Sequence, residues 1–297
     1  MLNITVDVYS GRPNPTFTLS DQETRDILKE IALHKGVITS CDVSRSNLGY
    51  RGINISSQSD TILHYFGLPP SFSIANGLSM FESKGREIAE RLLRSPSIIS
   101  ASYFDNYSIS PPLTNWILKE IKDMPIISFS KYENHPKFEP ENERIGCQYE
   151  QVAFEPHFWN TYYHIKRNNC YNFATNRRTD SFAQPGRASG KLYREITCYE
   201  VTKSAIADGL HKADSCFQEL EKPRLLMALF ISPGPEFVDY HWYRQCSDGN
   251  WAHKLGPTPV RNTDNSNYII TDPHTANRGQ YSQFCGYMLA PKSMKII

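Results

Sequence analysis

The chain has 297 residues, of which 39% are hydrophobic and 12% aromatic, and its formal net charge at pH 7 is +1. This composition can form one large core or two ordinary ones, which excludes a disordered chain, and the length favours two domains. The near-neutral charge gives no electrostatic reason to expect a nucleic acid or a membrane surface as a partner.

The first 125 residues mix strand and helix signals, which is typical of a small α+β domain. Alternating apolar residues indicate strands, and Ser20 with Glu23 forms a capping box at the start of a helix. Two prolines and a glycine after the first strand favour a rigid turn, with a recognition loop as the alternative. In chain order, the predicted elements are a strand over residues 3–9, a turn over Ser10–Pro15, a helix from Ser20 to about Leu33, a strand over Gly49–Ser56, and helices over Lys84–Arg94 and Thr114–Lys122.

A charged, proline-bearing stretch within residues 126–147 has no clear period, and we expect these residues to form a linker. Residues 148–297 then form the second predicted domain. Its helices precede its strands, which predicts an α+β fold with a mainly antiparallel sheet. The predicted elements are helices over Cys170–Arg177 and Thr197–Leu210, a loop over Asp180–Gly190 between them, and strands over Leu225–Ile231, Tyr240–Gln245, Asn250–Lys254, Tyr268–Thr271 and Phe284–Leu289.

Seven cysteines occur at wide spacing, without a CxxC pair. This odd, dispersed set argues against a disulfide framework and against a zinc site, and we expect neither a metal nor a cofactor. The first residues lack the basic and apolar regions of a secretion signal, and no apolar run is long enough to cross a bilayer. These features predict a soluble cytoplasmic protein, although signal-independent secretion would leave the same sequence.

Cys170 is the strongest candidate for chemistry in the chain. It follows Asn168 and Asn169 at the predicted start of a helix, where the helix dipole favours a thiolate. Four flanking cations would add to that effect: Lys166, Arg167, Arg177 and Arg178. The alternative is a buried structural cysteine, which is the commoner role of a free thiol.

His241 and His253 lie on the two strands of a predicted hairpin, where they could serve the thiol as base and orienting residue. The register of the hairpin decides whether they can. A two-residue turn at Asp248–Gly249 sends the imidazoles to opposite faces of the sheet. A three-residue loop over Ser247–Gly249 pairs Tyr243 with His253 and puts both imidazoles on one face.

The order of one cysteine and two later histidines resembles the papain-like NlpC/P60 peptidases over about residues 150–290. The resemblance implies a helix packed on an antiparallel sheet, with Cys170 as nucleophile, His241 as base and His253 as orienting residue. The chain departs from the family around the thiol, where Asn-Cys-Tyr-Asn replaces Asp-Cys-Ser-Gly. Phe158 also stands where the family has a tyrosine.

These features predict a divergent cysteine-dependent amide hydrolase or peptidase that works through an acyl-enzyme, with acyl transfer as a variant. Its partner would be a peptide or amide substrate, and the first domain would bind that substrate or a protein partner. The predicted substrate-binding residues are Asn169, Tyr162, Tyr163, Arg187 and Trp242.

The alternative is a non-enzymatic interaction or matrix-type protein, in which Cys170 is buried and the aromatic residues pack. The strings over residues 168–176 and 182–190 also resemble stretches of uncharacterised bacterial proteins and of invertebrate shell-matrix proteins. Thiol reactivity discriminates between the two functions. An activated Cys170 reacts with iodoacetamide at mildly acidic pH ahead of the other cysteines, whereas a structural one does not.

Overall fold

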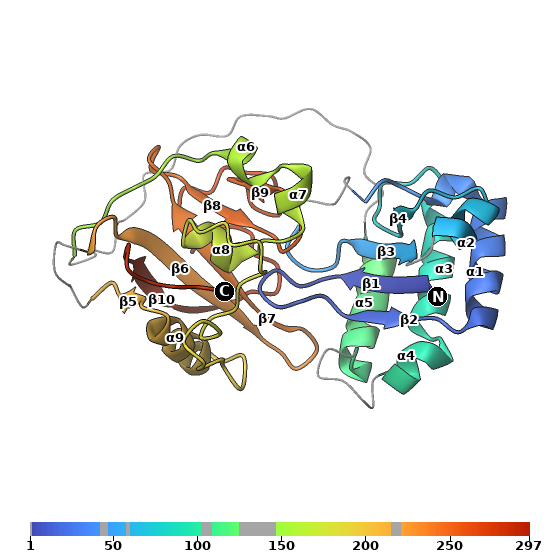
Figure 1. Ribbon diagram of the computed structural model, residues 1–297, viewed down its shortest axis with the longest axis horizontal. Coiled ribbons are helices and arrows are strands. Elements are labelled where there is room, and N and C mark those ends of the chain that lie inside the picture. Colours follow the sequence, from blue (N-terminus) through green and yellow to red (C-terminus); the bar gives the residue numbers. More distant parts are fainter. Residues whose placement is uncertain (1, 42–46, 58–59, 102–108, 125–146, 215–220) are drawn as a thin grey trace. The chain divides into compact units, whose positions relative to one another are not determined.

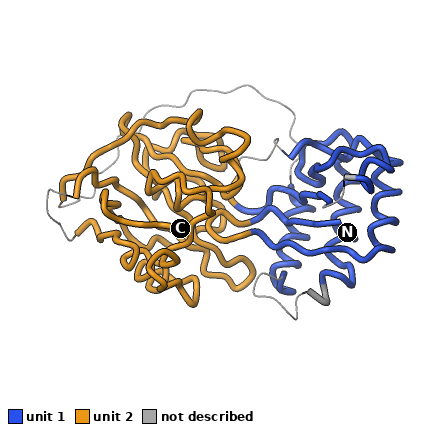
Figure 2. The backbone as a smooth tube through the Cα atoms, in the orientation of Figure 1, with its two compact units in different colours: residues 1–8, 14–45, 49–132 blue, residues 9–13, 46–48, 133–297 orange. Residues whose placement is uncertain are grey.

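The computed structural model describes residues 2–41, 47–57, 60–101, 109–124, 147–214 and 221–297, which divide into two compact units (Figures 1 and 2). Unit 1 comprises residues 1–8, 14–45 and 49–132, and unit 2 comprises residues 9–13, 46–48 and 133–297. Two short segments of the predicted first domain, residues 9–13 and 46–48, thus belong to unit 2. The predicted linker lies outside the described residues except for Cys147. In the described part of the chain, no helix is both long and apolar enough to cross a membrane.

Unit 1 is a four-stranded antiparallel sheet with helices, in the strand order β2-β1-β3-β4 (Figure 1). Its strands are β1 (Leu2–Asp7), β2 (Thr16–Thr18), β3 (Gly52–Ser57) and β4 (Ser71–Ile74). Its helices are α1 (Asp21–Leu33), the 3-10 turn η1 (Lys35–Val37), α2 (Asp60–Tyr65), α3 (Glu82–Leu93), α4 (Pro96–Ala101) and α5 (Pro111–Asp123).

The first strand, the first helix and its cap are as predicted. The Ser20 side chain accepts a hydrogen bond from the Glu23 backbone N–H, and the Glu23 carboxylate accepts one from the Ser20 N–H, so both halves of the capping box form. The predictions missed β2, β4, α2 and α4, which are short and carry weak periodic patterns.

Unit 2 is a six-stranded antiparallel sheet in the order β5-β10-β6-β7-β8-β9, with short helices. The two sheets and their helices confirm the predicted α+β class. The strands are β5 (His211–Lys212), β6 (Leu225–Pro233), β7 (Val238–Gln245), β8 (Trp251–Lys254), β9 (Val260–Arg261) and β10 (Gln283–Ala290). The helices are α6 (Pro156–Trp159), α7 (Tyr162–Ile165), α8 (Cys170–Ala174) and α9 (Cys198–Ala207).

Two predicted elements of unit 2 differ from the structure. The predicted strand Tyr268–Thr271 is wrong, because only isolated bridges form there, at Ile269 and Ile270. The helix from Cys170 ends at Ala174 instead of Arg177, and Asn176 then takes a positive φ of 55° that breaks the helix.

Cysteines form disulfides, contrary to the sequence-based expectation. Cys198 at the start of α9 is bonded to Cys285 of β10, and Cys147 is also disulfide-bonded. The expectation failed because the paired cysteines of α9 and β10 are 87 residues apart, and their pairing depends on the fold instead of on a local motif.

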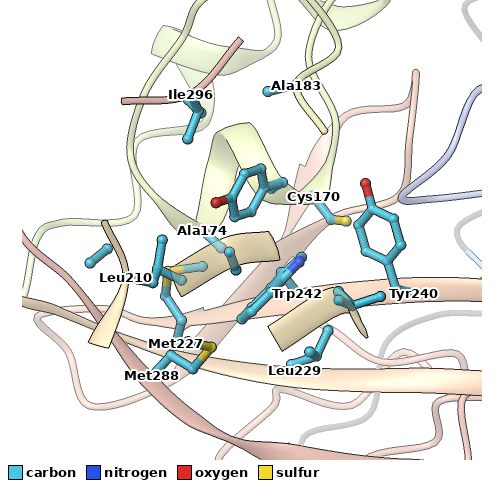
Figure 3. Close-up of a cluster of buried hydrophobic side chains, with 14 of the residues drawn as sticks. Cys170, Ala174, Ala183, Leu210, Met227, Leu229, Tyr240, Trp242, Met288 and Ile296 are labelled. Atoms are coloured by element: carbon cyan, nitrogen blue, oxygen red, sulfur yellow. The ribbon is translucent and has the colours of Figure 1, made fainter. Parts of the chain in front are cut away.

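Side chains of β6 and β7 separate onto two faces of the unit 2 sheet, because successive residues of a strand point in opposite directions. Leu229 pairs with Trp242, and both belong to the buried cluster around α8 (Figure 3). The neighbouring pair, Phe230 and His241, therefore points to the other face.

Candidate functional site

The hairpin of β7 and β8 has the register that brings the two histidines together. Tyr243 pairs with His253 across a three-residue loop, and Gly249 in that loop has a φ of 81°. The Nε2 atom of His241 lies 2.8 Å from Nδ1 of His253, and both side chains are fully buried. Of the two registers that the sequence left open, the hairpin therefore has the one that puts both imidazoles on one face.

The proton positions on His253 follow from its partners. Its Nε2 lies 3.0 Å from the Thr263 carbonyl oxygen, which can only accept, so Nε2 carries the proton. Burial, opposed by this hydrogen bond, lowers the pKa of His253 to about 3. At neutral pH its Nδ1 is therefore an acceptor, and His241 donates to it through Nε2.

The other nitrogen of His241 contacts a residue that the sequence did not single out. Its Nδ1 lies 2.9 Å from Oγ of Ser10, on the segment Tyr9–Pro13 of unit 2. Ser10 Oγ also lies 2.9 Å from the Tyr281 hydroxyl. The result is a chain of close polar contacts from Tyr281 through Ser10 and the two imidazoles to Thr263.

Asp239 anchors this chain and the segment that carries Ser10. Its Oδ2 accepts hydrogen bonds from the backbone N–H of Ser10 at 2.7 Å and of Gly11 at 3.2 Å, and from the Tyr281 hydroxyl at 2.6 Å. Its Oδ1 accepts from the Arg12 N–H at 3.1 Å. Burial raises the pKa of Asp239, although these donors oppose the shift. One carboxylate thus fixes three consecutive residues.

Cys170 is not part of this chain, so the predicted nucleophile–base pair is not formed. Its side chain packs with Tyr240 and Trp242, which leave β7 on the face opposite to His241 (Figure 3). Among the described residues, no hydrogen bond joins its sulfur to either imidazole. The side chain is fully buried, and this burial, together with the Asp239 charge, raises the pKa of the thiol. Cys170 is a protonated core residue in this structure.

The expected support for a thiolate is also missing, because the flanking arginines bond elsewhere. Arg167 donates to the Tyr163 hydroxyl, Arg177 to the carbonyls of Pro291 and Lys292, and Arg178 to the carbonyl of Phe158. The helix α8 has only five residues, so its dipole is small.

The predicted substrate-binding residues do not gather at one place. Trp242 and Asn169 are fully buried, and Trp242 is a core residue, which contradicts its predicted role. Tyr162 and Tyr163 are exposed on α7, with the Arg167 guanidinium stacked on the Tyr163 ring. Arg187 is half-buried in the loop that precedes α9.

Asn169 has a structural role that the sequence did predict. It is the N-cap of α8, and its Oδ1 accepts hydrogen bonds from the N–H groups of Tyr171 and Asn172. Its Nδ2 then points away from the helix and donates to the Gly11 carbonyl oxygen at 2.7 Å.

No cluster of three or more histidine, cysteine or acidic side chains suited to a metal ion occurs among the described residues. Unit 1 contains a separate cleft of about 590 Å³ between α1 and α3. Its lining mixes apolar side chains such as Ile27 and Leu92 with charged ones such as Glu23, Glu90 and Arg94. This lining points to no particular chemistry.

The buried His253 predicts a loss of stability in acid. The unfolded chain takes up a proton at this residue as the pH falls through about 6.5, whereas the folded imidazole stays neutral down to about pH 3. The unfolded state therefore binds more protons in this window, and the free energy of unfolding falls by up to about 1.4 kcal/mol for each pH unit below 6.5. Asp239 acts in the opposite direction, because its raised pKa lets the folded state take up a proton first.

The variant His253→Gln separates the contribution of His253 to this pH dependence of stability from that of Asp239. We expect His253→Gln to be less stable than the natural chain at neutral pH, but to lose less stability between about pH 7.5 and about pH 5. Urea unfolding at each pH measures this, and Asp239 contributes equally to both proteins. Parallel pH profiles would contradict a neutral, buried His253.

Fold and site together define an α+β protein with a buried pair of histidines, His241 and His253. Ser10 hydrogen-bonds to this pair, and Cys170 is a core residue on the other face of the sheet. No protein-family model matches the chain, and no solved structure matches it. The chain is 47% identical over 139 residues to "Insoluble matrix shell protein 1" of Ruditapes philippinarum, an alignment that covers 46% of this chain and 88% of that protein. The chain therefore belongs to the same family as that shell matrix protein.

Proposed function

We propose that the chain is a non-enzymatic, matrix-type protein whose second unit has a closed centre, in which Ser10 of the Tyr9–Pro13 segment hydrogen-bonds to the buried His241. The observation that carries this proposal is the 47% identity to an insoluble matrix shell protein over most of that protein's length. A shared family at this level of identity supports a shared structural role, although the aligned part is 46% of this chain.

The closed centre supports a non-catalytic role. A cysteine hydrolase needs a thiolate within reach of its base and of a substrate carbonyl. Here the thiol is buried and protonated, and the His241 nitrogen that would face a nucleophile is bonded to Ser10. A papain-like site would place the thiol and its base on the same face of the sheet, whereas Cys170 and His241 lie on opposite faces.

The disulfides support a location outside the cytoplasm, contrary to the sequence-based expectation. Disulfides persist in oxidising compartments and are rare in reducing ones. The bond between Cys198 and Cys285 would fasten α9 to β10 in such an environment. We therefore propose an extracellular matrix as the site of action.

Fractionation of the organism that makes the protein tests this function. We expect mass spectrometry to recover most of the chain from detergent-insoluble extracellular material, with a cytosolic enzyme as the control for leakage. Recovery in the cytosol, together with amide hydrolysis that is lost in Cys170→Ser, would overturn the proposal.

A further inference from the structure

The carbonyl oxygen of Gly11 lies among three side chains from separate elements of unit 2. Asn169 Nδ2 donates to it at 2.7 Å, Gln184 Nε2 at 2.9 Å and the Tyr240 hydroxyl at 3.1 Å. All three side chains are buried, with exposed fractions of 0%, 1% and 0%. We call Asn169, Gln184 and Tyr240 the carbonyl cradle.

Other contacts hold the two amides in this orientation. The Oδ1 of Asn169 accepts from two backbone N–H groups at the start of α8, which leaves Nδ2 to face Gly11. The Oε1 of Gln184 accepts from the Tyr193 hydroxyl at 2.7 Å, and its Nε2 is thereby directed to the same oxygen. The Tyr240 hydroxyl also lies 3.0 Å from Gln184 Oε1, so its single proton is shared between the two acceptors. Both amide nitrogens also donate to the Ala183 carbonyl oxygen, at 2.7 Å from Asn169 and 3.1 Å from Gln184, which holds the amides in place while they donate to the Gly11 oxygen.

The site also restricts which residues can stand at Gly11 and on either side of it. A Cβ atom at Gly11 would lie 2.4 Å from the Tyr240 carbonyl oxygen and 2.5 Å from its ring, so only glycine fits. The preceding residue offers its hydroxyl to His241, and the following residue, Arg12, donates its N–H to Asp239. These contacts specify a short bent segment with serine followed by glycine.

We propose that the carbonyl cradle, with His241 and Asp239, is a binding site for a bent Ser-Gly peptide segment, and that the chain's own Tyr9–Pro13 segment fills it. Asn169 is the chain neighbour of Cys170, and Tyr240 packs beside that thiol (Figure 3). Because two neighbours of the thiol bind the segment, we expect its release to expose both the cradle and Cys170. This site does not depend on the proposed matrix role.

Gly11→Ala in the full chain tests the site, because the added methyl group cannot enter it. We expect iodoacetamide to modify Cys170 at least about tenfold faster in this variant than in the natural chain, as measured by peptide mass spectrometry, since a buried thiol reacts only when it is uncovered. A synthetic peptide with the sequence of Tyr9–Pro13 should then slow the modification, and the same peptide with alanine for glycine should not.

Gly190→Ala is the control for an added methyl group outside the site, because a Cβ atom there meets nothing within 4 Å; its positive φ of 70° also makes it a control for a general loss of stability. It should leave Cys170 protected. If Gly11→Ala does not fold, Gln184→Met removes one donor without adding bulk at Gly11, and the same rise in modification is expected. A folded Gly11→Ala or Gln184→Met variant with a protected Cys170, an exposed Cys170 in Gly190→Ala, or equal effects of the two peptides would overturn the proposal.

Discussion

Asp239→Ala is expected to destabilise unit 2 by about 3 to 5 kcal/mol, because it leaves several buried donors without an acceptor. The carboxylate accepts from the N–H groups of Ser10, Gly11 and Arg12 and from the Tyr281 hydroxyl. Its side chain is fully buried, so water cannot replace it without opening the site. Urea unfolding followed by tryptophan fluorescence measures the loss, since three of the four tryptophans lie in unit 2.

Asp248→Ala provides the comparison for this substitution. Asp248 is an exposed residue of the hairpin loop and accepts only from Asn250. We expect its removal to cost less than about 1 kcal/mol. Equal effects of the two substitutions would show that Asp239 does not hold the Tyr9–Pro13 segment.

Loss of the Cys198–Cys285 disulfide should have a similarly large effect. The bond closes a segment of 87 residues, and the loop-closure entropy of a loop of this size corresponds to about 4 to 5 kcal/mol. The double variant Cys198→Ala with Cys285→Ala should therefore unfold at clearly lower urea concentration than the natural chain. The same measurement of tryptophan fluorescence applies.

Cys246→Ala is the control for the disulfide variant, because Cys246 is a buried free thiol of the same unit. It should cost roughly 1 kcal/mol, since it removes one sulfur atom from a packed site. Reductant should lower the stability of the natural chain and of Cys246→Ala by more than that of the double variant, which still contains the disulfide of Cys147. A double variant as stable as Cys246→Ala would mean that the cross-link contributes nothing.

Local signals predicted much of the fold. The capping box at Ser20 depends on residues three apart, and the Asp248–Gly249 pair between two strand patterns locates the hairpin, of whose two possible registers the structure has the three-residue loop. Both features arise from short-range hydrogen bonds and side-chain alternation, which the sequence displays directly.

Such local signals could not predict contacts between residues that are far apart in the sequence. Ser10 bonds to His241 across 231 residues, and nothing near Ser10 distinguishes it from the turn residue that the prolines suggested. Cys170 follows the expected helix cap, but its burial depends on the packing of Tyr240 and Trp242, which no motif describes. The sequence therefore located the two histidines of the centre but not Asp239, Tyr281 or the segment that closes it.

Alkylation of the native chain tests the closed centre most directly. We expect iodoacetamide at mildly acidic pH to modify Cys41, a partly exposed free thiol, while Cys170 and Cys246 react only after denaturation. Burial raises the pKa of both protected thiols, which further slows their reaction. Modification of Cys170 ahead of Cys41 in the folded protein would contradict a closed, non-catalytic centre.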